Sequence, residues 1–163
     1  MKKKLKTTVL VGALLTGVTT SVNAAPALAA RPPLVDLRGA GVGAYTLDAG
    51  GTARLNGAVT GAPFDGTYRA TLSSTDGSLP AAGTCERATA SLDVAGSRSR
   101  TLQLAATGEV CGTWAEAAYV VTHRFVGRYV VTDASVRKAR GTDGWISLIL
   151  ATEGRANVEA IDT

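Results

Sequence analysis

The sequence has few of the residue types from which most enzyme sites are built. Its 163 residues contain one histidine, two cysteines and one methionine, and aromatic residues make up only 5%. It has no Cys-x-x-Cys pair, no Gly-x-Ser-x-Gly elbow and no Asp-x-Asp-x-Asp-Gly calcium loop. We therefore expect no resident metal or cofactor, and we favour a protein that is not an enzyme. Paired carboxylates on distant strands stay open as an alternative, with the candidates Asp65, Asp93, Glu116 and Glu159.

Lysine is nearly absent beyond the first six residues. Four of the five lysines lie within residues 2–6, and the apolar run Val9–Val18 that follows is too short to span a membrane. Small residues then allow cleavage after Ala24 or after Ala29. This order of basic, apolar and small segments predicts a signal peptide over residues 1–29 and an extracellular location.

The basic charge of the chain belongs to this leader. Removing its four lysines takes the formal charge from +4 to zero, and the remainder has no basic run. The composition therefore excludes a nucleic-acid footprint and a polybasic membrane patch, and no membrane span is predicted in the mature chain. We expect a flexible segment over residues 30–40 and one domain over residues 41–163, long enough to bury a single core.

The cysteines Cys85 and Cys111 form an even pair in a chain predicted to be exported. A disulfide is the simplest interpretation, and closing a loop of about 26 residues stabilises by roughly 3 kcal/mol on the chain-entropy model. A redox or metal pair is the alternative, but a single histidine and the absence of a Cys-x-x-Cys spacing argue against it.

Short alternating segments separated by turn signals indicate an all-β protein. In residues 87–94 the apolar side chains alternate with polar ones, which predicts a strand with one buried and one wet face. Residues 145–150 are apolar on nearly both faces, which indicates a strand covered on both sides or one packed at a barrel corner. We predict strands over 42–47, 52–55, 58–72, 84–94, 99–106, 109–114, 118–134, 143–151 and 155–161. Turns are predicted at Asp48–Gly51, Asn56–Gly57, Asp76–Gly77, Gly96–Ser97 and Asp143–Gly144.

The chain also contains an internal echo. Residues 51–71 align with residues 112–132 without a gap at an offset of 61, and seven of the 21 paired positions are identical. We interpret this as two similar β units, at about 41–96 and 102–161. Eight or nine strands from two such units predict an antiparallel β-barrel, with a two-sheet β-sandwich as the alternative.

Both units contain the pattern Phe-x-Gly-x-Tyr, whose three residues share one face of a strand. The glycine leaves a notch that lets the strand bend or lets a side chain pack over bare backbone. We expect the four aromatic residues, Phe64, Tyr68, Phe125 and Tyr129, to be core, with the tyrosine hydroxyls at the rim. Pro63 is expected at an edge, a bulge or the end of a strand.

The single histidine, His123, falls on the same predicted face as Phe125 and Tyr129. An inward histidine can bind a ligand or move a proton, but no carboxylate lies near it in the sequence. We favour a satisfied core or rim histidine. The alternative is a ligand cavity near Tyr68, His123 and Tyr129.

Four segments of the predicted mature chain are informative for comparison: GSLPAAGTCERATASL (77–92), VCG (110–112), VVTHRFVGRYVV (120–131) and RGTDGWISLILATEGRANVEAIDT (140–163). In these segments the chain resembles small secreted proteins of high-GC actinobacteria that have no assigned function, and the resemblance extends over most of the predicted mature chain. It implies export and one compact domain, and it assigns no site residues.

Two further resemblances frame the function. The Phe-x-Gly-x-Tyr strands are similar to those of small eight-stranded barrels of the lipocalin, avidin and allene-oxide-cyclase kind, which implies a lumen for a small ligand. The segments Pro80–Cys85 and Cys111–Trp114 resemble subtilisin-inhibitor proteins, although those carry two disulfides. We therefore expect a secreted, non-enzymatic barrel that binds a small molecule or a cell-envelope component. The alternatives are a protease inhibitor that presents Cys111 to Ala115 as a loop, and a structural envelope protein.

Overall fold

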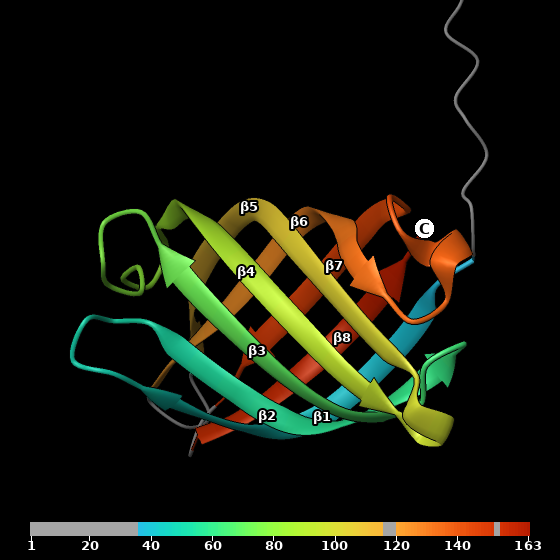
Figure 1. The fold of residues 1–163 in the computed structure, drawn as a ribbon. Helices are drawn as coiled ribbons and strands as arrows, with labels where there is room; N and C mark the ends of the chain where they lie inside the picture. Colours follow the sequence, from blue (N-terminus) through green and yellow to red (C-terminus); the bar gives the residue numbers. More distant parts are fainter. Residues whose placement is uncertain (1–35, 116–119, 152–153) are drawn as a thin grey trace, which may run out of the picture. The chain divides into compact units, whose positions relative to one another are not determined.

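In a computed structural model, which describes residues 36–115, 120–151 and 154–163, the chain forms a closed antiparallel β-barrel (Figure 1). Each strand is hydrogen-bonded to the next one along the chain, and β8 (Arg155–Asp162) pairs with β1 (Arg38–Leu47) to close the barrel. The predicted all-β barrel of eight or nine strands is confirmed, with eight described strands.

Among the described residues, the connections that follow Gly96 and Ala134 each contain a short 3₁₀ helix. Arg38 to Ala40, predicted as part of a flexible segment, belong to β1. The predicted signal peptide over 1–29 and the candidate carboxylate Glu116 lie outside the described residues. Between β1 and β8 the elements are β2 (Ala53–Ala62), β3 (Gly66–Ser74), β4 (Cys85–Gly96), η1 (Ser97–Ser99), β5 (Thr101–Ala115), β6 (Val120–Ala134), η2 (Arg137–Ala139) and β7 (Asp143–Leu150).

Alternate side chains of the strands fill the inside of the barrel. On β4 the inward residues Ala88, Ala90, Leu92 and Val94 are buried, while the polar residues between them are exposed, as the alternation predicted. Each large apolar side chain that is removed from water in this way stabilises the fold by about 1.5–3 kcal/mol. The interior is therefore a packed hydrophobic core.

Both ends of the barrel carry apolar side chains packed on this core. At the end where β1 begins, Leu37, Phe64 and Ala139 are buried, and the hollow beside Leu37 and Phe64 measures only about 10 Å³. At the other end, the connection between β3 and β4 places Leu79 against the core and buries Pro80. The interior hollow at the first end is too small for more than a single water molecule.

The four aromatic residues of the Phe-x-Gly-x-Tyr patterns are core residues, as predicted. The ring of Phe125 lies over Gly127, where an added Cβ would come 2.6 Å from Phe125 Cζ. Tyr68 packs over glycines of the neighbouring strands, because an added Cβ at Gly57 or Gly43 would lie within 3 Å of its ring or hydroxyl. Bare backbone thus makes room for large rings inside a narrow barrel.

The predicted hairpin turn at Asn56–Gly57 is wrong. Both residues lie inside β2, and Gly57 pairs with Gly43 on one side and with Tyr68 on the other. An added Cβ at Gly57 would meet the carbonyl oxygen of Val42 and the ring of Tyr68. The glycine therefore serves close packing rather than a turn, and long-range pairing overrides the local Asn-Gly signal.

The predicted continuous strand 58–72 is also wrong, because the chain turns between β2 and β3. Pro63, which follows the end of β2 as expected, cannot donate to a ladder. Asp65 accepts a hydrogen bond from the backbone N–H of Gly61 at 2.6 Å. Phe64 consequently lies in this turn, outside either strand.

Two predictions in the second half of the chain are wrong because a strand lies where a break or a turn was predicted. The break predicted between 99–106 and 109–114 does not exist, since β5 is bonded without interruption to β4 and β6 around Gly108. Asp143–Gly144, predicted as a turn, begins β7. The turn lies earlier, at Gly141, whose φ of 77° favours glycine.

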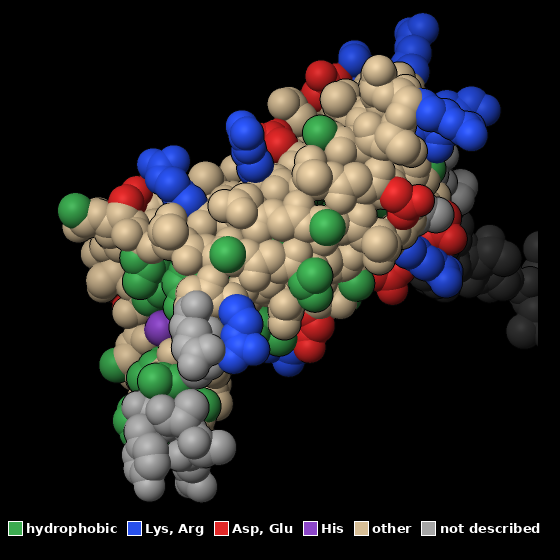
Figure 2. All heavy atoms as spheres, turned by 90° about the horizontal axis from the view of Figure 1, so that it is seen from below, with side chains coloured by type: hydrophobic (Ala, Val, Ile, Leu, Met, Phe, Trp, Pro, Cys, Tyr) green, Lys and Arg blue, Asp and Glu red, His purple; other side chains and the backbone are tan. Residues whose placement is uncertain are grey.

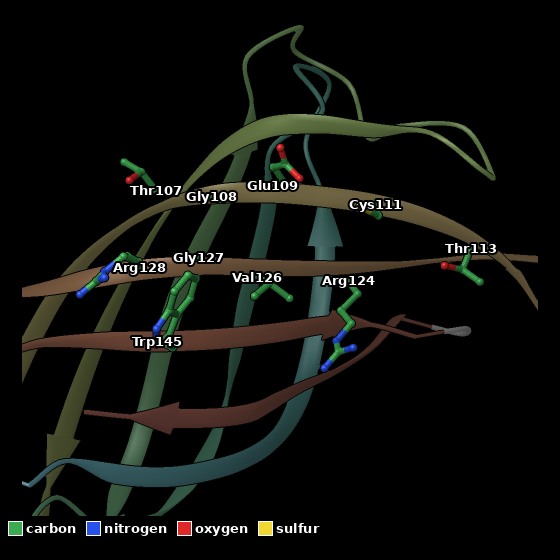
Figure 3. A pocket seen from close by; sticks show the side chains of 10 residues that line it. All are labelled: Thr107, Gly108, Glu109, Cys111, Thr113, Arg124, Val126, Gly127, Arg128 and Trp145. Atoms are coloured by element: carbon green, nitrogen blue, oxygen red, sulfur yellow. The ribbon is translucent and has the colours of Figure 1, made fainter.

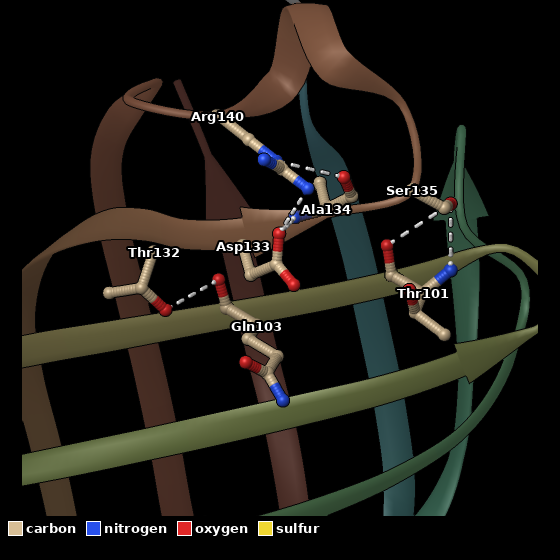
Figure 4. Close-up of polar contacts among 7 residues, drawn as sticks. All are labelled: Thr101, Gln103, Thr132, Asp133, Ala134, Ser135 and Arg140. Carbon is tan, nitrogen blue, oxygen red and sulfur yellow. Dashed lines mark hydrogen bonds and ion pairs between the residues drawn. The ribbon is translucent and has the colours of Figure 1, made fainter.

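Side chains complete the backbone hydrogen bonds where β6 ends (Figure 4). Ser135 Oγ accepts a hydrogen bond from the N–H of Thr101 at 2.9 Å. Arg140 forms a 2.7 Å ion pair with Asp133 and donates to the carbonyl of Ala134. These contacts hold the β6–β7 connection over the barrel end at a place where the β5–β6 register shifts.

Two equivalent four-stranded halves would align β1 to β4 with β5 to β8, and the 61-residue offset does not do so. It places Tyr68 of β3 on Tyr129 of β6. Because all neighbours are antiparallel, odd-numbered and even-numbered strands run in opposite directions, so β3 and β6 are oppositely oriented. The shared residues are therefore better explained by similar packing demands than by a structural repeat.

Candidate functional site

A groove of about 750 Å³ lies on the outside of the barrel, across β5, β6 and β7 (Figure 3). This volume falls within the range of small-ligand sites in proteins. The side chains that line it alternate with buried core residues along each strand, so they point outward. They are Thr107, Glu109, Cys111, Thr113, Arg124, Val126, Arg128 and Trp145, with Gly108 and Gly127 in the backbone between them.

The strand register arranges these side chains in rows across the sheet. Thr107, Arg128 and Trp145 form one row, because Thr107 pairs with Arg128 and Arg128 pairs with Trp145. In the next row Glu109 pairs with Val126. Directly paired residues have Cβ atoms about 5 Å apart, so Glu109 and Val126 lie side by side in the middle of the groove.

Trp145 is the most exposed aromatic side chain of the groove, at 53%. The guanidinium carbon of Arg128 lies 5.4 Å from the centroid of its ring, and Arg128 is in turn paired with Asp143 at 2.7 Å. In Figure 3 the ring stands between Arg128 and Val126. One ring face is therefore covered by a fixed cation, while the other faces Val126 and the groove.

A polar network forms the opposite end of the groove. Arg124 donates to Glu159 at 2.7 Å, and Ser147 Oγ donates to the same carboxylate oxygen at 2.7 Å. The hydrogen bond from Ser147, together with Arg124, holds the pKa of Glu159 below its usual value, against a smaller opposing effect of desolvation. Arg124 is thus held in place by two partners, Ser147 and Glu159.

The sequence prediction of two covered faces for residues 145–150 is correct for Ser147 and wrong for Trp145. Ser147 points outward but is only 7% exposed, because Arg124 and Glu159 lie over it. Trp145, two residues earlier on the same face of β7, is not covered. The apolar run identified a strand, but its composition could not distinguish a covered residue from an exposed aromatic one.

The predicted ligand residues Tyr68 and Tyr129 lie in the packed interior, at 1% and 0% exposure. Their hydroxyls are buried without a hydrogen-bond partner in the described structure, so the expectation that they reach the rim is wrong. Burial raises the pKa of both phenols, and for Tyr129 the carboxylates of Asp162, Asp143 and Asp36 raise it further. A role for these residues in ligand binding stays a prediction, and it would require a molecule to enter the core.

His123 lies at the end of the barrel that is covered by the β3–β4 connection. Its Nε2 is 3.0 Å from the carbonyl oxygen of Pro80, and the side chain is partly buried. Gly112, its partner on β5, exchanges hydrogen bonds with Thr84 and Gly83 of the same connection. These contacts match the satisfied rim histidine that we favoured. In Figure 2 the histidine is visible among hydrophobic side chains.

Cys85 and Cys111 form the predicted disulfide, between directly paired residues of β4 and β5. The segment Cys111 to Ala115, proposed as an inhibitory loop, is instead part of β5 and is paired with β6 throughout. A protease inhibitor normally offers an extended segment with free backbone groups, which this paired strand does not. The bridge fixes one wall of the groove to β4, and a disulfide is typical of exported proteins.

Metal chemistry gives no competing site in the described residues. On the face shown in Figure 2, acidic and basic side chains are interspersed along the barrel, and several basic ones lie near one another at one end. Within residues 36–115, 120–151 and 154–163, no three His, Cys, Asp or Glu side chains are grouped so that they could hold a metal ion. None of the helices in this part of the chain is long and apolar enough to cross a membrane.

Sequence reasoning did not identify the groove. Arg124, Val126 and Arg128 alternate with the core residues Phe125 and Gly127 on β6, so their outward direction was readable once the strand was recognised. Their combination with Trp145 was not readable, because it depends on the register between β6 and β7. An exposed tryptophan beside alternating charged residues was the available signal.

No protein-family model, no curated protein and no solved structure matches this chain. A function for the groove consequently has to follow from the chemistry of its own side chains.

Proposed function

We propose that this protein is an exported, non-enzymatic β-barrel domain that binds a component of the cell envelope in the outer groove over β5, β6 and β7. The observation that carries the proposal is Trp145, an indole half exposed to solvent and stacked on one face by Arg128. Exposed aromatic rings that are held rigidly are the usual anchors of binding surfaces, because they bury a large area at little cost in conformational entropy.

The packed interior of the barrel favours the outer groove as the binding site. Inward side chains fill the barrel, and the hollow at the end beside Leu37 and Phe64 is about 10 Å³. A groove of about 750 Å³ on the outside can accept a much larger molecule without any rearrangement of the core. Such an open surface suits a component of a wall or a polymer better than a small molecule that must be enclosed.

Export is supported by the disulfide and by the predicted signal peptide. Cys85 and Cys111 are paired, and a disulfide persists in oxidising compartments outside the cytoplasm. An exported domain whose outer groove presents an exposed aromatic ring is well placed to bind at the cell surface. The resemblance to actinobacterial secreted proteins directs the choice of test material.

The test is a pelleting assay with cell-envelope material from a high-GC actinobacterium. We expect the mature protein to sediment with this material, and Trp145→Ala to reduce the bound fraction at least about tenfold, as is typical for an aromatic hot spot. Trp114→Ala is the matched control, because Trp114 is 49% exposed but lies outside the residues that line the groove. Equal loss in both variants, or no sedimentation of the wild type, would contradict the proposal.

A further inference from the structure

The chemistry of the groove also defines the class of molecule that it accepts. We infer that the ligand is a neutral glycan, bound with a sugar ring against the free face of Trp145 and with its hydroxyls directed to Glu109 and Arg124. This inference rests on the proposed function of the groove and adds the ligand class. Four features of the described residues carry it.

The first feature is the stacking surface. Trp145 has one face covered by Arg128 and the other directed to Val126 and the groove (Figure 3). A pyranose ring has a similar duality, with apolar C–H groups on its faces and hydroxyls around its edge. Indole and Val126 together offer an apolar corner for such a face, and the surrounding side chains are polar.

The second feature is the set of hydrogen-bonding groups around that corner. Glu109 supplies a carboxylate, which only accepts hydrogen bonds, and Arg124 supplies a guanidinium, which only donates them. A hydroxyl does both, so a molecule with several hydroxyls can bond to Glu109 in the middle of the groove and to Arg124 at its end at the same time. Thr107 and Thr113 add two more hydroxyl partners along the β5 side.

The third feature is charge, which argues against an anionic ligand. Arg124 is paired with Glu159 and Arg128 with Asp143, so both cations of the groove already have anionic partners. The carboxylate of Glu109 then repels an anion in the middle of the groove, and neither arginine is left unpaired to attract one. A neutral ligand avoids this repulsion and keeps the hydrogen bonds.

The fourth feature is the shape of the site. The lining side chains stand on one outer face. Along β6, the row of outward side chains from Arg128 through Val126 to Arg124 spans four residue steps, which is roughly 13 Å. A linear polymer can lie along this row and continue beyond it. Recognition of an internal stretch of a chain, rather than of its end, follows from this arrangement.

The deciding experiment separates the envelope material by anion exchange into neutral polysaccharide, anionic polysaccharide and the remaining protein and lipid. Each fraction then competes with intact envelope for the full mature protein. We expect the neutral polysaccharide to displace the protein and to change its tryptophan fluorescence. Displacement by the anionic polysaccharide alone, or by the protein and lipid alone, would overturn the glycan inference and leave envelope binding intact.

Three variants assign the binding to the groove. With the neutral fraction we expect Trp145→Ala to weaken binding at least about tenfold and Glu109→Gln about threefold to tenfold, the range for one ordinary hydrogen bond. Trp114→Ala should change it less than about twofold. Unchanged binding by Trp145→Ala would overturn the inference. Absence of any sedimentation with envelope, with Trp145-dependent binding of neutral polysaccharide retained, would instead refute the envelope target and keep the glycan.

Discussion

Two outer faces of the same barrel differ in a way that points to where binding occurs. Over β2, β3 and β4 a shallow hollow of about 300 Å³ is lined by Arg54, Asn56, Arg69, Thr71, Ser91 and Asp93, with Leu55 and Ala70 beneath. Over β5, β6 and β7 the groove has similar arginines, threonines and an acid, but also Trp145 and Val126. The difference is an apolar corner set within a polar surface.

The ion pairs of the two halves differ as well. Among the described residues of the first half, both pairs are local in sequence, Arg38 with Asp36 and Arg54 with Asp48. The second half has a local pair, Arg140 with Asp133. It also has Arg128 with Asp143 and Arg124 with Glu159, which connect different strands. Pairs that bridge strands hold their side chains in a fixed place, as a binding surface requires. Both faces cover the same hydrophobic core, so the core does not determine which side chains the strands present on the outside.

The largest effect is expected from removal of the covalent link beneath the groove. Replacing Cys85 and Cys111 by serine should lower the free energy of unfolding by roughly 3 kcal/mol, because the unfolded chain regains the freedom of a 26-residue loop. Thr71→Ala, which removes the 2.8 Å hydroxyl pair with Ser91 on the other face, should cost no more than about 1 kcal/mol. Urea denaturation gives both values, and equal losses would show that the two faces are equally dependent on their cross-strand links.

A smaller loss is expected where the barrel wall has no room for a side chain. In Gly127→Ala the new Cβ would lie 2.6 Å from Phe125 Cζ and 2.7 Å from the carbonyl oxygen of Thr107, so we expect destabilisation by about 1–3 kcal/mol. Gly39→Ala on β1 is the control, since its nearest neighbours lie at 3.5 Å. Thermal unfolding should therefore separate the two variants, and a stable Gly127→Ala would contradict this account of the notch.

Replacing an arginine on each of the two faces should give a smaller difference in stability than the changes above. Arg128→Gln removes both an ion pair and a contact with the ring of Trp145, and we expect a loss of about 1 kcal/mol with a change in tryptophan fluorescence. Arg54→Gln removes only the exposed pair with Asp48, so its effect should stay within about 0.5 kcal/mol. An unchanged fluorescence spectrum in Arg128→Gln would mean that the cation does not hold the indole.

The smallest effect is expected in how the stability of the face over β5, β6 and β7 depends on pH. The pKa of Glu159 is lowered in the folded protein, so its contribution is present above about pH 4.5, the ordinary value for glutamate, and is lost as the pH falls through the folded pKa. The stability difference between wild type and Glu159→Gln should therefore shrink on acidification.

Ser147→Ala provides the control for this prediction, because the Ser147 hydroxyl is the largest cause of the lowered pKa. Removing it should reduce the same acid dependence while leaving the charge of Glu159 in place. Melting temperatures measured from neutral to acidic pH give the comparison. A difference that widens on acidification would reverse the predicted sign.

The sequence alone determined the class of fold and the inside of the barrel. Alternation identified β4 with the correct inward residues, and the even cysteine pair indicated the disulfide. These features were readable because burial imposes a period of two on every strand and because two cysteines in an exported chain have one simple outcome.

Only the tertiary structure decided where strands begin and end and which outward residues meet. Gly57 lies within a strand because the ring of Tyr68 packs over it, which a local turn signal cannot reveal. Trp145 and Arg128 meet because β6 and β7 pair in one particular register. Outward side chains carry no periodic constraint from the core, so their assembly into a site depends on pairing between strands and cannot be read from one strand alone.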